Sequence, residues 1–101
     1  MDFAGFDWDV GNSAKCRKHG LSLEAIESVF VGPVLVLPDR ENPQERRFRA
    51  IGTTAGGRKA FIVFTLRERM GARLIRPISA RYMHGTEVKA YEEAYPDFRD
   101  G

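Results

Sequence analysis

The spacing of apolar residues predicts helices in the first third of the chain. Within residues 23–30, apolar side chains recur at intervals of three and four, which places them on one face of a helix. Ser22 precedes this segment as an N-cap, and Gly32 and Pro33 end it. A shorter helix is expected before it, over residues 14–18, with Asn12 or Ser13 as its N-cap.

After the helices, the pattern changes to the alternation that is typical of strands. The predicted strands cover residues 34–37, 46–52, 59–66 and 73–81. Short loops that contain glycine join the last three, which indicates an antiparallel meander. Pro77 has no N–H to donate to a neighbouring strand, so it indicates an edge position or a bulge.

A third helix is predicted near the C-terminus. Thr86 is its expected cap, its apolar stripe is Val88, Tyr91 and Tyr95, and Pro96 ends it. The fold class is therefore α+β, with two N-terminal helices, an antiparallel sheet of about four strands and a C-terminal helix. A chain of 101 residues suffices for one domain, expected to span residues 1–101 with its core at about 6–95.

Charge is unevenly distributed along the chain, although the net charge is only +2. Residues 40–81 hold eleven basic and three acidic side chains, and arginine outnumbers lysine twelve to four overall. Because guanidinium groups bind phosphates and carboxylates in a bidentate manner, an anionic partner is indicated. The alternative is a solvated surface of exposed arginines.

Cysteine content and hydropathy exclude several classes of protein. One cysteine, Cys16, permits neither an intramolecular disulfide nor a zinc site built from paired thiolates. Asp7, Asp9 and Glu45 lack the spacing of a metal site, so no metal or other cofactor is expected. With no long apolar run and no signal-peptide pattern, we expect a soluble, cytoplasmic protein without a membrane partner.

The basic strands favour chemistry on RNA phosphates. Attack by a ribose 2′-hydroxyl requires a base, an acid and positive charge near the phosphorus, and arginines held on strands supply that charge. Histidine is the usual proton carrier at neutral pH, and the chain has two, His19 and His84. Strict alternation places Arg76 and Arg81 on opposite faces of the last strand.

Each of these candidates also has a structural interpretation. His19 is equally suited to binding carbonyl groups at the end of a helix, and His84 to lying exposed before one. In the structural interpretation, Arg76 forms an ion pair with an acidic residue of a helix, and Arg81 forms an ion pair with Glu87.

Three segments together resemble a known toxin family. They are FDWD followed by AKCRKHGLSLEAIESVF, then RRFRAIG, then RPISARYMHGTEVKAYEEA, and together they span about residues 6–93. This arrangement is similar to that of BrnT-type toxins. The resemblance implies a RelE-like fold and a metal-independent endoribonuclease that inhibits translation as the toxin of a bacterial type II toxin–antitoxin pair.

The resemblance also implies partners and site residues. The expected partner is a BrnA-like antitoxin with a ribbon-helix-helix DNA-binding module, which neutralises the toxin in a hetero-oligomer; RNA is the expected substrate. The matching site positions are Lys15, His19, Arg47, Arg76 and Arg81, with His19 as acid or base and the arginines as phosphate ligands. The competing interpretations are a nucleic-acid-binding domain without catalysis and a protein-interaction module.

Overall fold

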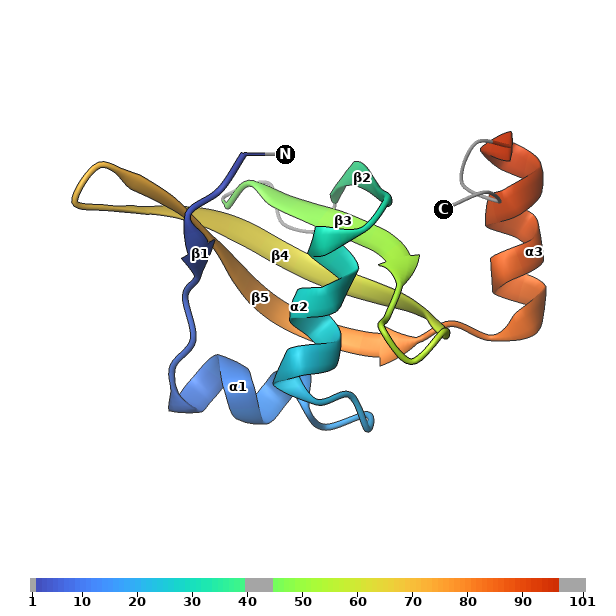
Figure 1. Cartoon of the computed structure of the whole chain (residues 1–101), viewed down its shortest axis with the longest axis horizontal. Helices are drawn as coiled ribbons and strands as arrows, with labels where there is room; N and C mark the ends of the chain where they lie inside the picture. The colour runs from blue at the N-terminus through green and yellow to red at the C-terminus, as the bar shows by residue number, and fades with distance from the viewer. Residues whose placement is uncertain (1, 40–44, 97–101) are drawn as a thin grey trace.

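The computed structural model describes residues 2–39 and 45–96, in which three helices pack with one sheet (Figure 1). The predicted loop over residues 39–45 and the chain end after Pro96 lie largely outside the described residues. The elements in chain order are β1 (Gly5–Phe6), α1 (Val10–Cys16), α2 (Leu23–Val31), β2 (Val34–Asp39), β3 (Arg47–Thr53), β4 (Lys59–Arg69), β5 (Ala72–Tyr82) and α3 (Gly85–Ala94).

The sheet has five strands in the order β1-β5-β4-β3-β2. Strands β2 to β5 form the predicted antiparallel meander. The prediction of about four antiparallel strands is wrong at one edge, where β1 pairs in parallel with β5 through Gly5–Leu74 and Phe6–Ile75. A strand of two residues is too short to show a periodicity, so the sequence pattern did not indicate β1 or its parallel pairing with β5.

A two-residue turn joins β4 and β5. Arg69 pairs with Ala72, and the intervening Met70 and Gly71 have φ angles of 54° and 80°. Two successive positive φ angles are typical of a type I′ turn, whose twist matches that of a hairpin. Both strands therefore extend further than the predicted 59–66 and 73–81, and the hairpin projects from the body of the molecule (Figure 1).

Strand β5 contains the bulge that Pro77 suggested. Val63 pairs with Ser79, whereas the next residue, Phe64, pairs with Pro77, so Ile78 is the extra residue. One extra residue reverses the alternation of side chains beyond it.

The bulge places Arg76 and Arg81 on the same face of the sheet, and the prediction of opposite faces is wrong. Arg76 pairs with Thr65 and Arg81 with Phe61, and these partners lie four residues apart on one unbroken strand. Residues four apart on a strand share a face, as do directly paired residues on adjacent strands.

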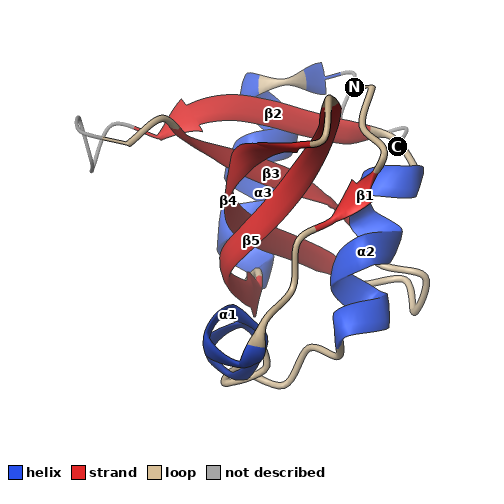
Figure 2. Ribbon diagram, turned by 90° about the vertical axis from the view of Figure 1, so that its left-hand side faces the viewer, coloured by secondary structure: helices blue, strands red, loops and turns tan. Residues whose placement is uncertain are grey.

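The main core lies between α2 and one face of the sheet (Figure 2). Ile26, Val29 and Phe30 of α2 are buried, as the helical spacing predicts. Phe30 meets Phe64 edge-to-face with ring centroids 5.2 Å apart, a favourable aromatic geometry.

Helix caps follow the sequence signals in one case and depart from them in two. Ser22 caps α2 as predicted, accepting a 3.0 Å hydrogen bond from Ala25 N. The cap of α1 is Asp9 rather than Asn12 or Ser13, because its side chain accepts from Asn12 N.

The N-cap of helix α3 lies two residues earlier than expected, and the helix packs on the other face of the sheet. Its N-cap position is His84, and Thr86 lies within the first turn. Val88 and Tyr91 contact a small second core that is centred on Ile51 and Met83. No helix within the described residues is long and apolar enough to span a membrane.

Candidate active site

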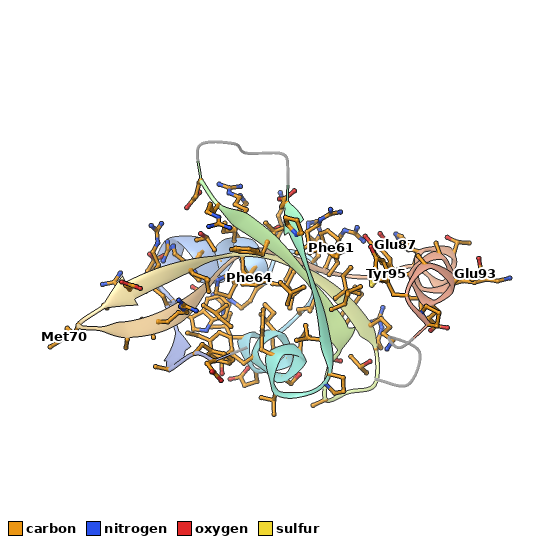
Figure 3. All side chains as sticks on the ribbon, turned by 90° about the horizontal axis from the view of Figure 1, so that it is seen from above. Phe61, Phe64, Met70, Glu87, Glu93 and Tyr95 are labelled. Atoms are coloured by element: carbon orange, nitrogen blue, oxygen red, sulfur yellow. The ribbon has the colours of Figure 1, made fainter. Side chains whose placement is uncertain are left out.

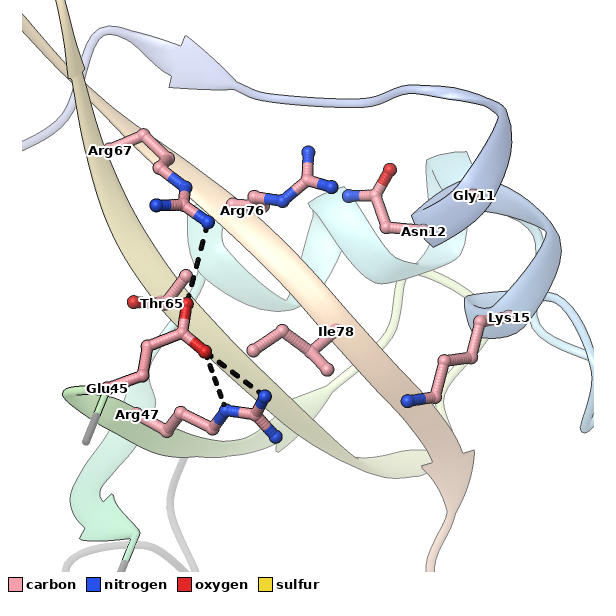
Figure 4. A pocket seen from close by; sticks show the side chains of 9 residues that line it. All are labelled: Gly11, Asn12, Lys15, Glu45, Arg47, Thr65, Arg67, Arg76 and Ile78. Atoms are coloured by element: carbon pink, nitrogen blue, oxygen red, sulfur yellow. Dashed lines mark hydrogen bonds and ion pairs between the residues drawn. The ribbon is translucent and has the colours of Figure 1, made fainter. Parts of the chain in front are cut away.

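An open pocket of about 310 Å³ lies where α1 meets the sheet face opposite α2 (Figure 4). Four of its lining side chains are cationic and one is a carboxylate. The lining residues are Gly11, Asn12, Lys15, Glu45, Arg47, Thr65, Arg67, Arg76 and Ile78. Such an excess of fixed positive charge in an open hollow favours an anionic ligand.

Arg76 is held by two carboxylates from the segment before α1. Its Nη2 lies 2.9 Å from Asp9 Oδ2, and its Nη1 lies 3.4 Å from Asp7 Oδ2. The Asp9 hydrogen bond is the main reason that the pKa of Arg76 is raised. The pKa of Asp9 is lowered, first by the hydrogen bond from the backbone of Asn12 and then by Arg76. The guanidinium is thus permanently charged and fixed in direction.

Glu45 joins two further arginines across β3 and β4. Its Oε2 accepts from Nε and Nη2 of Arg47, both at 3.1 Å, and its Oε1 lies 3.5 Å from Arg67 Nη2 (Figure 4). The side chains of Arg47 and Glu45 are 28% and 32% exposed, so both are partly accessible from solvent.

Asn12 fixes α1 against the bulge. Its Nδ2 donates to the carbonyls of Asp7 and Pro77, each at 2.9 Å, and its Oδ1 accepts from Asp9 N. All of the amide's usual bonding capacity except one acceptor lone pair is therefore used within the protein. Lys15 lies three residues later on the same helix, and its side chain extends into the pocket (Figure 4).

Three of the predicted site residues lie together, namely Lys15, Arg47 and Arg76. His19 is exposed in the turn that follows α1 and does not line this pocket. Its expected role in proton transfer stays a prediction. His84, at the start of α3, is also exposed and outside the pocket.

Arg81 lies near α3 and forms an ion pair with Glu87, which is the structural interpretation of this residue. Its Nη1 and Nη2 each lie 2.8 Å from an oxygen of Glu87, and its guanidinium stacks 4.7 Å from the ring centroid of Phe61. Figure 3 shows Glu87 on the side of α3 that is nearer to the sheet. The pKa of Arg81 is raised and that of Glu87 is lowered, chiefly by their mutual hydrogen bonds.

Sequence reasoning missed several residues of this pocket. Arg67 lies just beyond the predicted strand 59–66, whereas β4 continues to Arg69. Continued alternation places Arg67 on the same face as Thr65, which pairs with Arg76. Asp7 and Asp9 were weighed only as metal ligands, and no local signal pairs them with an arginine almost seventy residues away.

Comparison with known families identifies the chain. Residues 8–87 match the family model described as the ribonuclease toxin BrnT of type II toxin–antitoxin systems. The chain belongs to the BrnT family. BrnT proteins are ribonuclease toxins, and a type II system pairs the toxin with a protein antitoxin. No curated protein matches the sequence significantly.

Proposed function

We propose that this BrnT protein is a metal-independent endoribonuclease with a RelE-like fold that binds the scissile phosphate among Arg47, Arg67 and Arg76. The observation that carries the proposal is the convergence of these arginines with Lys15 on one open pocket. The pocket faces solvent, as a site for a polymer substrate requires.

The arginines suit the charge that develops during phosphodiester cleavage. Attack of a 2′-hydroxyl on phosphorus gives a transition state with two negative charges on the phosphoryl oxygens. Guanidinium groups that are already oriented stabilise this charge without reorganisation. The two carboxylates on Arg76 supply such orientation, since they hold both Nη atoms.

Lys15 and His19 are the proposed proton donors. Lys15 lines the pocket and carries three N–H donors that can protonate a leaving oxygen. His19 follows in the turn after α1, and its exposed ring is free to meet a bound RNA strand. Arg81, with 40% of its side chain exposed, is placed to contact a more distant phosphate of the same strand.

The antitoxin is proposed to act by covering the cationic pocket. A BrnA-like partner with a ribbon-helix-helix module would bring an acidic segment to Arg47, Arg67 and Arg76 and exclude phosphate. Inhibition and RNA binding would then compete for the same side chains, and an RNA oligonucleotide should compete with the antitoxin segment.

Cleavage of RNA by the purified protein tests the proposal. We expect cleavage in excess EDTA, 2′,3′-cyclic phosphate ends on the products, and no cleavage at 2′-deoxy positions. Arg47→Ala and Arg76→Ala should each lower the rate about 100-fold or more, since each removes a charge-stabilising donor.

Arg58→Ala is the matched control, because Arg58 is exposed and stacks on Tyr82 outside the pocket. It should cleave at nearly the wild-type rate. Tight RNA binding without cleavage by the wild type would overturn the proposal in favour of a nucleic-acid-binding domain. Loss of cleavage in EDTA would overturn the metal-independent mechanism.

A further inference from the structure

One carboxylate, that of Glu45, lines the cationic pocket within the described residues. The other polar side chains that line the pocket are poor proton acceptors. The carboxylates of Asp7 and Asp9 do not line it and are bound to the guanidinium of Arg76. Guanidinium and ammonium groups only donate, and the Thr65 hydroxyl already donates to Arg46 O at 2.7 Å. Resting on the endoribonuclease function above, we propose that Glu45 is the general base that removes the proton from the attacking 2′-hydroxyl.

The position of Glu45 follows from the strand register. Phe48 pairs with Phe64, and continuing this antiparallel register places Arg47 beside Thr65 and Glu45 beside Arg67. Glu45 and Arg47 lie two residues apart, so their side chains share the pocket face. The hydrogen bonds agree with this register, since Glu45 accepts from both arginines on that face.

The present partners of Glu45 are the groups that a phosphate would engage. Two N–H groups of Arg47 and one of Arg67 point at the Glu45 oxygens. Phosphate oxygens entering between these arginines compete for the same donors. Substrate binding would thereby free the Glu45 oxygens to accept a hydrogen bond from the 2′-hydroxyl.

The chemical step balances without any further reactant. The 2′-hydroxyl proton moves to Glu45 as the bond from O2′ to phosphorus forms. The bond from phosphorus to O5′ then breaks, and O5′ takes a proton from the Lys15 ammonium group. The products are a 2′,3′-cyclic phosphate and a 5′-hydroxyl, and proton exchange with water restores Glu45 and Lys15.

A purely structural role for Glu45 makes different predictions. If Glu45 only orients Arg47 and Arg67, its replacement weakens substrate binding and raises KM. If Glu45 is the base, replacement lowers kcat and removes the limb of the pH–rate profile in which the rate rises as the carboxylate loses its proton.

The test compares Glu45→Gln and Glu45→Asp in cleavage of a short RNA with one scissile bond. We expect Glu45→Gln to lower kcat by about 10²- to 10⁴-fold and to lose the acidic limb, and Glu45→Asp to retain part of both. Binding of the 2′-deoxy analogue should be unchanged or tighter in Glu45→Gln, since a negative charge leaves the cationic pocket. Glu93→Gln, on the far side of α3, is the matched control (Figure 3).

A substrate with sulfur in place of O5′ separates the base from the acid, because a thiolate leaves without protonation. This substrate should restore cleavage in Lys15→Ala but not in Glu45→Gln. An unchanged kcat and pH–rate profile in Glu45→Gln would overturn the assignment of Glu45 as the base. Rescue of Glu45→Gln by the sulfur substrate would do the same, and both results would leave the ribonuclease function intact. A wild type that cleaves no RNA would overturn both.

Discussion

Asn12 Nδ2 donates a 2.9 Å hydrogen bond to the backbone carbonyl of Pro77, 65 residues further along the chain. The bond is buried, and it holds the pocket wall formed by α1 against the bulge in β5. Asn12 itself is only 7% exposed. This single amide therefore joins the two parts of the chain that provide Lys15 and Arg76.

Replacing Asn12 with alanine should destabilise the fold. The carbonyls of Asp7 and Pro77 lose their donor, and a buried polar group without a partner costs about 1–3 kcal/mol. We expect the free energy of unfolding, measured in urea, to fall by about 2 kcal/mol or more. Ser13→Ala, which removes only an exposed 3.3 Å hydrogen bond, should change it by less than about 0.5 kcal/mol. Equal effects of the two changes would contradict this role of Asn12.

Gly52 marks the close approach of α2 to β3. A Cβ atom at this position would lie 3.0 Å from Val29 Cγ1 and 3.2 Å from Pro33 O. Gly52→Ala should therefore lower the free energy of unfolding by about 1–3 kcal/mol through overpacking. Gly56→Ala provides the comparison, because its Cβ would meet nothing closer than 3.7 Å. An unaffected thermal midpoint in Gly52→Ala would show that α2 can shift away from the sheet.

The ion pair between Arg81 and Glu87 should make part of the stability depend on pH. Because the pKa of Glu87 is lowered in the folded protein, its contribution is complete above its ordinary value of 4.5 and is lost as pH falls through the folded value. Glu87→Gln lacks this contribution, so its free energy of unfolding should be lower than that of the wild type at neutral pH. The two free energies should converge in acid. Urea unfolding at several pH values measures both curves. Parallel curves would contradict the role of the pair.

Cys16 should be unreactive in the folded protein. The thiol is fully buried, and burial raises its pKa to about 11 from an ordinary 9.0. At pH 8 the thiolate fraction then falls by roughly 100-fold, and access is blocked as well. Alkylation followed by mass spectrometry should be at least that much slower in buffer than in concentrated urea. Similar rates in both solvents would mean that α1 opens readily.

Local signals predicted those elements whose cap and apolar pattern both lie within one short segment. Ser22 and the apolar spacing of residues 23–30 suffice to define α2, since its cap and its buried face are both properties of a short segment. Alternation likewise located β3 and β4, apart from their ends. By contrast, α1 has three potential caps within five residues, and the choice of Asp9 follows from the burial of Asn12 against Pro77.

The candidate site was predictable in its charge and not in its geometry. The enrichment of arginine predicts an anionic partner, and the resemblance to BrnT-type toxins implies Arg47 and Arg76 as phosphate ligands. Both residues line the pocket. Pro77 indicated an edge position or a bulge, but strict alternation could not show that a bulge would bring Arg76 and Arg81 to one face. The partners of Arg76 depend on packing between distant segments, which a period of two cannot reveal. For Glu45, the sequence pattern tests only metal-ligand spacing, and no local signal shows that it also meets Arg67.

The pocket combines segments that are far apart in the chain, and its Lys15 and Arg76 are separated by 61 positions. Helix α1 docks on β5, and β5 reaches Tyr82 before its pairing with β4 is complete. A chain that is still leaving the ribosome thus carries its arginines as scattered charges, without an assembled pocket. The residues of β5 must therefore have been translated before the cationic pocket can form.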